Sequence, residues 1–587
     1  MPQMPRIKTD LDIPLNETFS YGHDKWHSPV NPRILEFYLY LADYDLSESQ
    51  FLVKGFSEGF MIGHYGALNN TIVENDVSIS LLHDEALEKV LKEVNLGRID
   101  GPFEGVPACF KDDFHCSPCK IIPKKSPGNY RLLHNYSYPY DQSAVNSNIL
   151  DVYKRVRYES VRDAVKKICN YYPGLFMAKD DIEDAFRLLP LHYTEFKKLL
   201  FSIGDYVYCD LAGSMGCSSI CQLWERFATA LHYMAKNMHL ISSKFCASPV
   251  SLELGVNSLF HRQDDCLGKS AGDLCHMADD FLLLNQSEVG CRIDQSNFHW
   301  LCHDLGVPIA WDKSCSPATN MDFLGISFDT QNESASIPHE KVAQYLEDIS
   351  EFLKLKRVSL KQCQSLAGKL SFAASVVQGR AFLRRLFELI ATVARKNNRF
   401  LFVNGELRKD LVTWQTFLCN YNCLTFYRLV DPFVDTNIVI ESDASNIGFG
   451  LVYGSVWIQG YYPAECTAID INTRELYPVL VIMEMLGQSW QNSVVRFVTD
   501  NSCTLGAINN QSSKSKSSMI IIRRLVILLL KWNIHLKAQH IAGKKNILPD
   551  RISRFAVSSD LLRAYNMNDT PLQIPQHLWP TISTFKC

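Results

Sequence analysis

The chain has 587 residues, room for several domains, and its composition of 47% hydrophobic and 21% charged residues is that of an ordinary globular protein. Its net charge of −4 argues against a general nucleic-acid binder, but the charges are unevenly placed. Between Lys354 and Arg399 there are eleven Lys or Arg residues and one acid, a block able to neutralise backbone phosphates. The alternative for this block is a solvated basic helix face.

The 19 cysteines follow no repeating spacing, which indicates reduced and mostly buried thiols. Cys116 and Cys119 form one CxxC pair, but no second pair follows at the spacing of a zinc finger, so we expect no zinc there. No signal peptide is visible, and the apolar run 520–532 contains two arginines and is too short to span a membrane. We therefore expect a soluble intracellular protein in the cytoplasm, the nucleus or both.

Hydrophobic spacing and turn residues divide the chain into segments of different character. Apolar residues at helical spacing predict a helical N-terminal part, and helices again in the basic stretch. Between these, strand-like and helical runs alternate, and a new α/β region begins with a strand near residue 437, followed by a second strand at 451–458. The predicted segments are a helical extension (1–95), an α+β region (96–330), a basic helical region (331–430), an α/β domain (431–556) and a tail (557–587).

Three aspartates form the first candidate site. Asp181 ends an apolar, strand-like stretch, and Asp279-Asp280 lies between two apolar runs, which predicts the tip of a hairpin beside Asp181. Acids packed together are costly without a cation, and two metal ions held by carboxylates lower the barrier to phosphoryl transfer. Most Asp-Asp pairs are surface turns, and Asp264-Asp265, which lacks apolar flanks, is interpreted as one.

Four further acids form the second candidate site, with a histidine ten positions before the last. Asp443 and Asp500 each end a strand-like run, and Glu475 opens an amphipathic run. Asp550 follows His540 in the stretch 539–554. One set suits a polymerase and the other a nuclease. The alternative is four unrelated surface carboxylates.

Several motifs resemble those of reverse transcriptases. The Asp279-Asp280 turn is similar to their Tyr-x-Asp-Asp box. The other similar stretches are 179–192 (first palm motif), 213–218 (glycine loop), 305–313 and 322–326 (fourth motif and primer grip), and 117–125 with 131–134 (fingers hairpin). The second acid set resembles ribonuclease H of retroelements. The sequences at Met215-Gly-Cys-Ser, 379–385 and 538–543 resemble those of DIRS-type retrotransposons, which use a tyrosine recombinase. The resemblance covers residues from about 30 to 580.

The resemblance implies a multidomain α+β protein: a right-hand polymerase with fingers and palm at 96–330 and thumb and connection at 331–430, then a ribonuclease H-like domain. It implies two Mg²⁺ ions per site, with Mn²⁺ as a substitute. The implied metal ligands are Asp181, Asp279 and Asp280 in the polymerase, and Asp443, Glu475, Asp500 and Asp550 in the nuclease, where His540 assists product release. The implied nucleotide-binding residues are Lys124, Lys125, Arg131, Phe186 (a gate against the ribose 2′-hydroxyl), Gly216 and Lys313 (a general acid). Phe186 as core and Lys313 as a solvated loop residue are the alternatives.

The implied function is RNA-directed DNA synthesis with degradation of the RNA strand of the hybrid. The implied partners are an RNA template, a DNA primer, deoxynucleoside triphosphates and a separately encoded tyrosine recombinase, with no membrane. Departures from the family pattern are Met277-Ala278, a longer stretch at 240–272, and Pro549 before the last acid. Two other interpretations stay open: a decayed or host-adopted copy that binds nucleic acid without polymerase activity, and a ribonuclease H with an inactive polymerase.

Overall fold

The computed structural model describes residues 27–124, 128–170, 174–245, 272–396, 400–422, 424–425 and 436–585. The chain divides into two compact units, Met1–Leu324 and Gly325–Cys587, each described here by itself. Lys125, Asp264-Asp265 and most of the longer stretch at 240–272 lie outside the described residues.

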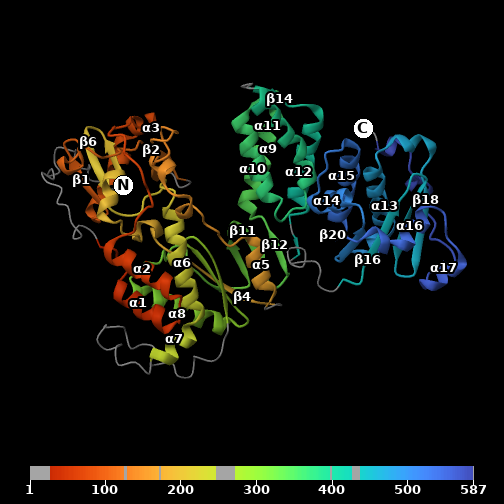
Figure 1. Cartoon of the computed structure of the whole chain (residues 1–587), viewed down its shortest axis with the longest axis horizontal. Helices are drawn as coiled ribbons and strands as arrows, with labels where there is room; N and C mark the ends of the chain where they lie inside the picture. The colour runs from red at the N-terminus through yellow and green to blue at the C-terminus, as the bar shows by residue number, and fades with distance from the viewer. Residues whose placement is uncertain are drawn as a thin grey trace, which may run out of the picture. The chain divides into compact units, whose positions relative to one another are not determined.

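The first unit combines helices with three small sheets (Figure 1). Its helices are α1 (Pro32–Leu41), α2 (Leu46–Glu58), α3 (Val77–Leu81), α4 (His83–Asn95), α5 (Val161–Cys169), α6 (Ile220–Lys236), α7 (Met238–Phe245) and α8 (Glu288–Leu305). Its strands are β1 (Ile99–Phe103), β2 (Cys119–Pro123), β3 (Tyr130–His134), β4 (Phe176–Asp181), β5 (Leu200–Ile203), β6 (Tyr206–Asp210), β7 (Asp273–Met277), β8 (Asp280–Asn285), β9 (Cys315–Ala318) and β10 (Asn320–Phe323). The sheets have the orders β1-β6-β5, β2-β3 and β7-β8-β4-β9.

The sheet β7-β8-β4-β9 places the first set of aspartates. β4 runs antiparallel to β8, and Asp181 pairs with Asp280 at the end of the ladder. α6 packs against β7 and α8 packs against β4 and β8, so Phe281 and Leu283 of β8 are buried in a core that they share with Phe298. Leu282 and Leu284, on the other face of β8, are also fully buried, so β8 is a core strand covered on both faces.

The hairpin between β7 and β8 differs by one position from the prediction. Met277 pairs with Asp280, so the two-residue turn is Ala278-Asp279 and Asp280 already belongs to β8. Ala278 has a φ of 55°, in the left-handed region that a non-glycine residue seldom adopts. The turn that carries Asp279 is therefore tight.

The second unit combines helices with a five-stranded mixed sheet (Figure 1). Its helices are α9 (His339–Lys354), α10 (Leu360–Ala373), α11 (Arg384–Lys396), α12 (Gly405–Asn420), α13 (Ile471–Leu486), α14 (Ser502–Asn510), α15 (Lys516–Lys531), α16 (Ile547–Ser553) and α17 (Ser559–Ala564). Its strands are β11 (Ile326–Asp329), β12 (Ser334–Ser336), β13 (Arg357–Ser359), β14 (Phe400–Phe402), β15 (Leu424–Thr425), β16 (Val439–Ala444), β17 (Gly448–Tyr453), β18 (Val456–Tyr461), β19 (Val494–Thr499) and β20 (His535–His540).

The five-stranded sheet has the order β18-β17-β16-β19-β20, with β16, β19 and β20 parallel and β17 and β18 antiparallel. α13 packs against β16 and α14 against β20. The predicted single strand at 451–458 was wrong: β17 ends at Tyr453, and Gly454, with a φ of 56°, turns the chain into β18. Glycine adopts this conformation without the strain that a Cβ would introduce.

The C-terminal segment, predicted as a tail, packs along the edge strand β18. The amide of Asn568 donates to the carbonyl of Ser455 at 2.9 Å, and that of Leu572 donates to Trp457 at 2.9 Å. The ring of Phe585 lies 5.3 Å from that of Tyr477, centre to centre. These contacts cover a sheet edge that would otherwise offer unpaired backbone groups to another chain.

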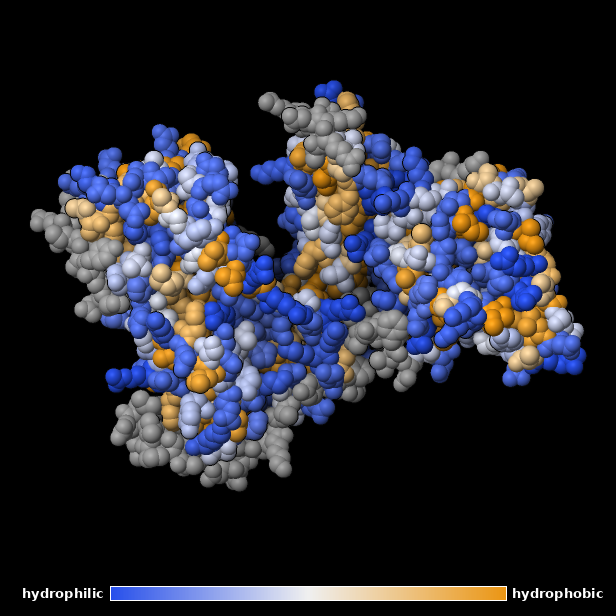
Figure 2. Space-filling model, viewed as in Figure 1, coloured by the Kyte–Doolittle hydropathy of each residue, from blue (hydrophilic) through white to orange (hydrophobic). Residues whose placement is uncertain are grey.

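The face of the molecule in Figure 2 is largely hydrophilic, with apolar residues in small groups. No described helix is long and apolar enough to cross a membrane. Part of the basic stretch is neutralised internally, since Arg385 and Arg523 both contact the buried carboxylate of Asp410, at 2.7 and 3.2 Å. This pair of contacts ties α11 and α12 to α15.

Candidate active sites

The three aspartates of the first set lie around the end of the β4–β8 ladder. The Nζ atom of Lys313 donates to Oδ1 of Asp181 at 2.7 Å, and the amide of Ile182 donates to the carbonyl of Asp279 at 3.0 Å. Burial, together with the Asp181 charge, raises the pKa of Asp279. Burial likewise raises the pKa of Asp280, with the charges of Asp279 and Asp181 adding to the effect. A nearby cation would favour the ionised form of all three.

A cavity of about 520 Å³ opens beside these acids. Asp181, Asp279 and Phe186 line it, and so do Met215 and Ser214 of the glycine-rich loop. The cationic residues that line it are Lys89, Lys92, Lys124, Arg131, Arg187 and Lys313. A cavity with carboxylates and several Lys and Arg residues suits a polyanion that arrives with divalent cations, because ionised donors make the strongest hydrogen bonds to phosphate.

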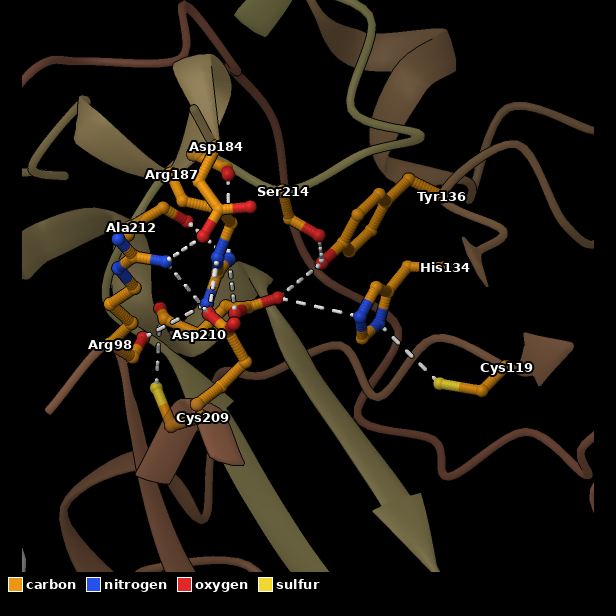
Figure 3. Close-up of polar contacts among 12 residues, drawn as sticks. Arg98, Cys119, His134, Tyr136, Asp184, Arg187, Cys209, Asp210, Ala212 and Ser214 are labelled. Carbon is orange, nitrogen blue, oxygen red and sulfur yellow. Dashed lines mark hydrogen bonds and ion pairs between the residues drawn. The ribbon is translucent and has the colours of Figure 1, made fainter. Parts of the chain in front are cut away.

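A buried ionic network forms part of the cavity wall (Figure 3). Arg187 donates to Oδ1 of Asp210 at 2.8 Å and to Oε2 of Glu93 at 2.9 Å. The Oδ2 atom of Asp210, which is fully buried, lies 3.4 Å from the hydroxyl of Tyr136 and 3.6 Å from Nε2 of His134. Burial lowers the pKa of His134, which favours the neutral imidazole. The network connects the β2–β3 hairpin with β6 and α4.

Close approaches to the loop at 213–216 explain two of its glycines. A Cβ on Gly213 would meet the carbonyl oxygen of Phe186 at 2.4 Å, and one on Gly216 would meet that of His134 at 2.1 Å. Gly216 also has a φ of 112°. Because only glycine fits both the space and the backbone angle at 216, this position is fixed by the approach of the loop to β3. Arg187 lies 3.4 Å from the carbonyls of Ala212 and Gly213, so it contacts the start of the same loop.

The second acid set gathers at the end of the five-stranded sheet. Ligand atoms of Asp443, Glu475 and Asp500 all lie within 4.8 Å of one another. Asp443 lies in β16, Asp500 follows β19 directly, and Glu475 lies in α13. Because β16 and β19 are parallel neighbours, their carboxyl ends meet at one edge of the sheet. The helix then adds the third carboxylate from beside that edge.

Burial dominates the electrostatics of this cluster. It raises the pKa of Asp443 to about 6 and that of Glu475 to about 8, with the neighbouring carboxylates adding to both shifts. Oε2 of Glu475 is buried and has no hydrogen-bond partner. Such an arrangement is costly unless a cation binds it, and oxygen ligands are those that Mg²⁺ prefers. The three residues therefore fit a divalent ion.

Asp550 and His540 lie at the margin of the cluster. Asp550, in α16, contributes to the raised pKa of Asp443 and contacts Arg554 at 2.7 Å. His540 ends β20, is exposed, and pairs with Thr499, next to Asp500. Neither belongs to the group within 4.8 Å. Asp181, Asp279 and Asp280 likewise form no such group among the residues that the structure describes.

The sequence analysis missed several residues of both sites. Ser553 donates to Oδ2 of Asp443 at 2.7 Å, and its position three residues after Asp550 on one helix was a signal that could have found it. Lys89 and Lys92 of α4 and the pair Arg187–Asp210 gave no local signal, since each acts on groups far away in the sequence.

No protein-family model and no curated protein sequence matches this chain. Among solved structures, the chain is similar to the foamy viral protease-reverse transcriptase in complex with an RNA/DNA hybrid, with 12% identity and a TM-score of 0.44 over 92% of this chain. It is also similar to that protein in complex with double-stranded DNA, with 14% identity, a TM-score of 0.41 and coverage of 87% of this chain and 97% of the other. The chain spans 65% of the length of the first.

We expect Arg187→Met to destabilise the first unit by roughly 3–5 kcal/mol, because it leaves the buried charge of Asp210 without its cation. Thermal or urea unfolding measures the change. The matched control is Arg292→Met, which removes an ion pair of the same 2.8 Å length whose two side chains are 60% and 53% exposed. That control should cost no more than about 1 kcal/mol. Equal losses in the two variants would contradict a stabilising role for the network.

In the absence of metal, the raised pKa of Glu475 makes the second unit less stable as the pH rises. Below its ordinary pKa, Glu475 is protonated in both states, whereas between that value and about 8 only the unfolded chain releases the proton. Folding stability should therefore fall by roughly 1–4 kcal/mol between pH 4.5 and pH 8. Thermal unfolding in a chelating buffer at both pH values should show a smaller fall for Glu475→Gln. The exposed Asp560→Asn serves as the control.

Proposed function

We propose that the chain is an RNA-directed DNA polymerase with ribonuclease H activity, which copies retrotransposon RNA into DNA and degrades the RNA strand of the hybrid. The observation that carries this proposal is the presence of two separate acidic sites on one chain, of which the first opens onto a cation-lined cavity and the second gathers three carboxylates. The sequence motifs around both sites support it.

In the first site, Asp181, Asp279 and Asp280 would hold Mg²⁺, which when bound would supply charge neutralisation for in-line phosphoryl transfer. Lys124 and Arg131 line the cavity and neutralise the triphosphate. Phe186 lies in the wall where it would meet a ribose 2′-hydroxyl, and Gly216 lets the loop pass close to β3. Lys313 carries a proton at Nζ, and its hydrogen bond to Asp181 raises its pKa, so it stays charged until it donates to the leaving pyrophosphate.

In the second site, Asp443, Glu475, Asp500 and Asp550 would hold metal ions, whose chemistry when bound is the activation of water for hydrolysis of the RNA strand. Ser553 orients the carboxylate of Asp443 through its 2.7 Å hydrogen bond. The exposed His540 lies at the strand end beside Asp500 and assists release of the cleaved product. Asp550 forms an ion pair with Arg554 at 2.7 Å, and both side chains are exposed.

The finer assignment is a right-hand arrangement of fingers and palm at 96–330 and thumb and connection at 331–430, followed by ribonuclease H at 431–556. The basic helices of the second unit would grip the hybrid through its phosphates, which makes binding independent of sequence. The sequences of the motifs favour a DIRS-type element whose tyrosine recombinase is encoded separately. Mg²⁺ is the expected ion, with Mn²⁺ as a substitute.

A second candidate is a ribonuclease H with an inactive polymerase. Two observations favour it. The ligand atoms of Asp443, Glu475 and Asp500 lie within 4.8 Å of one another, whereas the three aspartates of the first site form no such group among the described residues. In addition, Lys313 forms an ion pair with Asp181. In a polymerase, binding of the nucleotide and its metal would have to separate that ion pair.

Primer extension on an RNA template with Mg²⁺ and deoxynucleotides separates these candidates. We expect Asp279→Asn to lose extension by at least about a thousandfold while RNA cleavage remains, and Asp443→Asn to show the reverse, because each removes a metal ligand of one site. End-labelled RNA and labelled primer report the two activities in one reaction. Cleavage without extension in the unmodified chain would establish the second candidate, and binding of the hybrid with neither activity would establish a decayed copy.

Phe186→Val should raise incorporation of ribonucleotides relative to deoxynucleotides by about ten- to a hundredfold, because a smaller side chain in the cavity wall leaves room for a 2′-hydroxyl. Single-nucleotide extension with each substrate gives the ratio of kcat/KM values. The matched control is Phe196→Val, which truncates a phenylalanine of the same core away from the cavity. An unchanged ratio in Phe186→Val would assign Phe186 to the core alone.

A further inference from the structure

A second cluster of metal-ligating side chains lies in the first unit, and neither proposed active site uses it. It consists of Glu159, His232 and His276, whose ligand atoms all lie within 4.8 Å of one another. Glu159 lies just before α5, His232 lies in α6, and His276 lies in β7. The cluster therefore joins three segments that are far apart in the sequence, at the strand that leads into the Ala278-Asp279 turn.

The imidazole rings of His232 and His276 contact each other through their Nδ1 atoms. Nδ1 of His232 and Nδ1 of His276 are 2.8 Å apart. Two ligands of one tetrahedral zinc ion lie roughly 3.3 Å apart, given Zn–N bonds of about 2.0–2.1 Å. A shift of a few tenths of an ångström therefore brings the two nitrogens to the separation of two ligands of one zinc ion.

A carboxylate stands behind His276 on the side away from His232. Nε2 of His276 lies 3.2 Å from Oε1 of Glu225, and both residues are buried. Neither Nε2 of His276 nor Oε2 of Glu225 has a hydrogen-bond partner. A metal-bound histidine typically turns its other ring nitrogen toward a carboxylate, which fixes the tautomer and leaves the first nitrogen free to bind the ion. Glu225 is placed for this role.

Glu159, the third member of the cluster, keeps room for a metal ion beside its present contacts. Glu159 is engaged by Nζ of Lys167 at 2.5 Å through Oε1 and by the amide of His276 at 2.7 Å through Oε2. A carboxylate has about four lone-pair positions, so both contacts leave room for one metal bond. Lys167 also donates to the carbonyl of Leu274. This second hydrogen bond would keep Lys167 in place when a metal ion neutralises part of the charge of Glu159.

We propose that Glu159, His232 and His276 form a structural zinc site that fastens β7 to α6 and to the segment before α5. Two imidazoles and a carboxylate are ligands that zinc accepts, and a water molecule completes four-coordination. The side chain of Glu159 is 25% exposed, which gives the ion a path from solvent. The three residues are distinct from both acid sets. If the zinc proposal fails its test, the proposal of polymerase and nuclease activity is therefore unaffected.

A zinc ion at this site would restrain the neighbouring turn that carries Asp279. His276 precedes Asp279 by three residues, and among the described strands β7 lies at the edge of its sheet, with β8 as its one neighbour. An ion that holds β7 from the other side restrains the hairpin at its free edge. Removal of zinc should therefore lower the thermal stability of the first unit.

Zinc titration of the full-length protein tests the proposal. The protein is first stripped with a chelator and then kept in millimolar Mg²⁺, so that Mg²⁺ occupies the oxygen-rich acid sites. Competition with a chromophoric chelator should show one tightly bound Zn²⁺ per chain, and bound Co²⁺ should give the visible absorption bands of a four-coordinate site. His232→Gln and Glu159→Gln should each weaken Zn²⁺ binding at least tenfold and abolish the Co²⁺ bands.

Two matched variants separate this site from other binding. His303→Gln removes a histidine of α8 whose side chain is 69% exposed, and Glu475→Gln alters the nuclease acids, so both should keep the full zinc equivalent. Zn²⁺ should also raise the unfolding temperature of the unmodified chain but not of His232→Gln. The proposal is wrong if the unmodified chain binds no more zinc than His232→Gln, or if only Glu475→Gln loses it. In that case the two histidines share a proton in an ordinary hydrogen bond.

Discussion

Carboxylates that are brought together inside a protein need a cation, and this constraint shapes both acid sites. Desolvation disfavours each charge, and the neighbouring charges add to the cost. The buried Glu475, with one oxygen left without a partner, shows the constraint most directly. Asp181 meets it differently, because Lys313 provides the countercharge within the chain. Binding of a cation to such a site would stabilise the folded state.

The scaffold around the first site supplies the rigidity that such a site requires. Arg187 pairs with the buried Asp210 and the partly buried Glu93 and reaches the backbone of the glycine loop, so ion pairs hold the cavity wall. Breaking one member of a buried network is expensive, which fixes the wall in one arrangement. The loop then approaches β3 so closely that only glycine fits at position 216.

Net charge says little about where this chain can bind a polyanion. The total of −4 hides a cavity lined by six Lys and Arg residues and a basic helical stretch in the second unit. Several of those cations form ion pairs within the chain, as Arg385 does with Asp410. Their charge is therefore already partly neutralised by the fold. The local arrangement of charge, and not its sum, determines which surface attracts phosphates.

Local sequence pattern was enough to place Asp181, Asp443 and Asp500 at or next to strand ends, because an apolar run followed by an acid is a local signal. The same kind of pattern predicted helices in the basic stretch and the hairpin between β7 and β8, although it placed the turn one residue late. The contacts of Arg187 with Asp210 and of His232 with His276, and the packing of the C-terminal segment along β18, depend on the folded chain. Those partners are joined by packing between distant segments, and no periodicity or spacing along the chain records which buried polar groups will find each other.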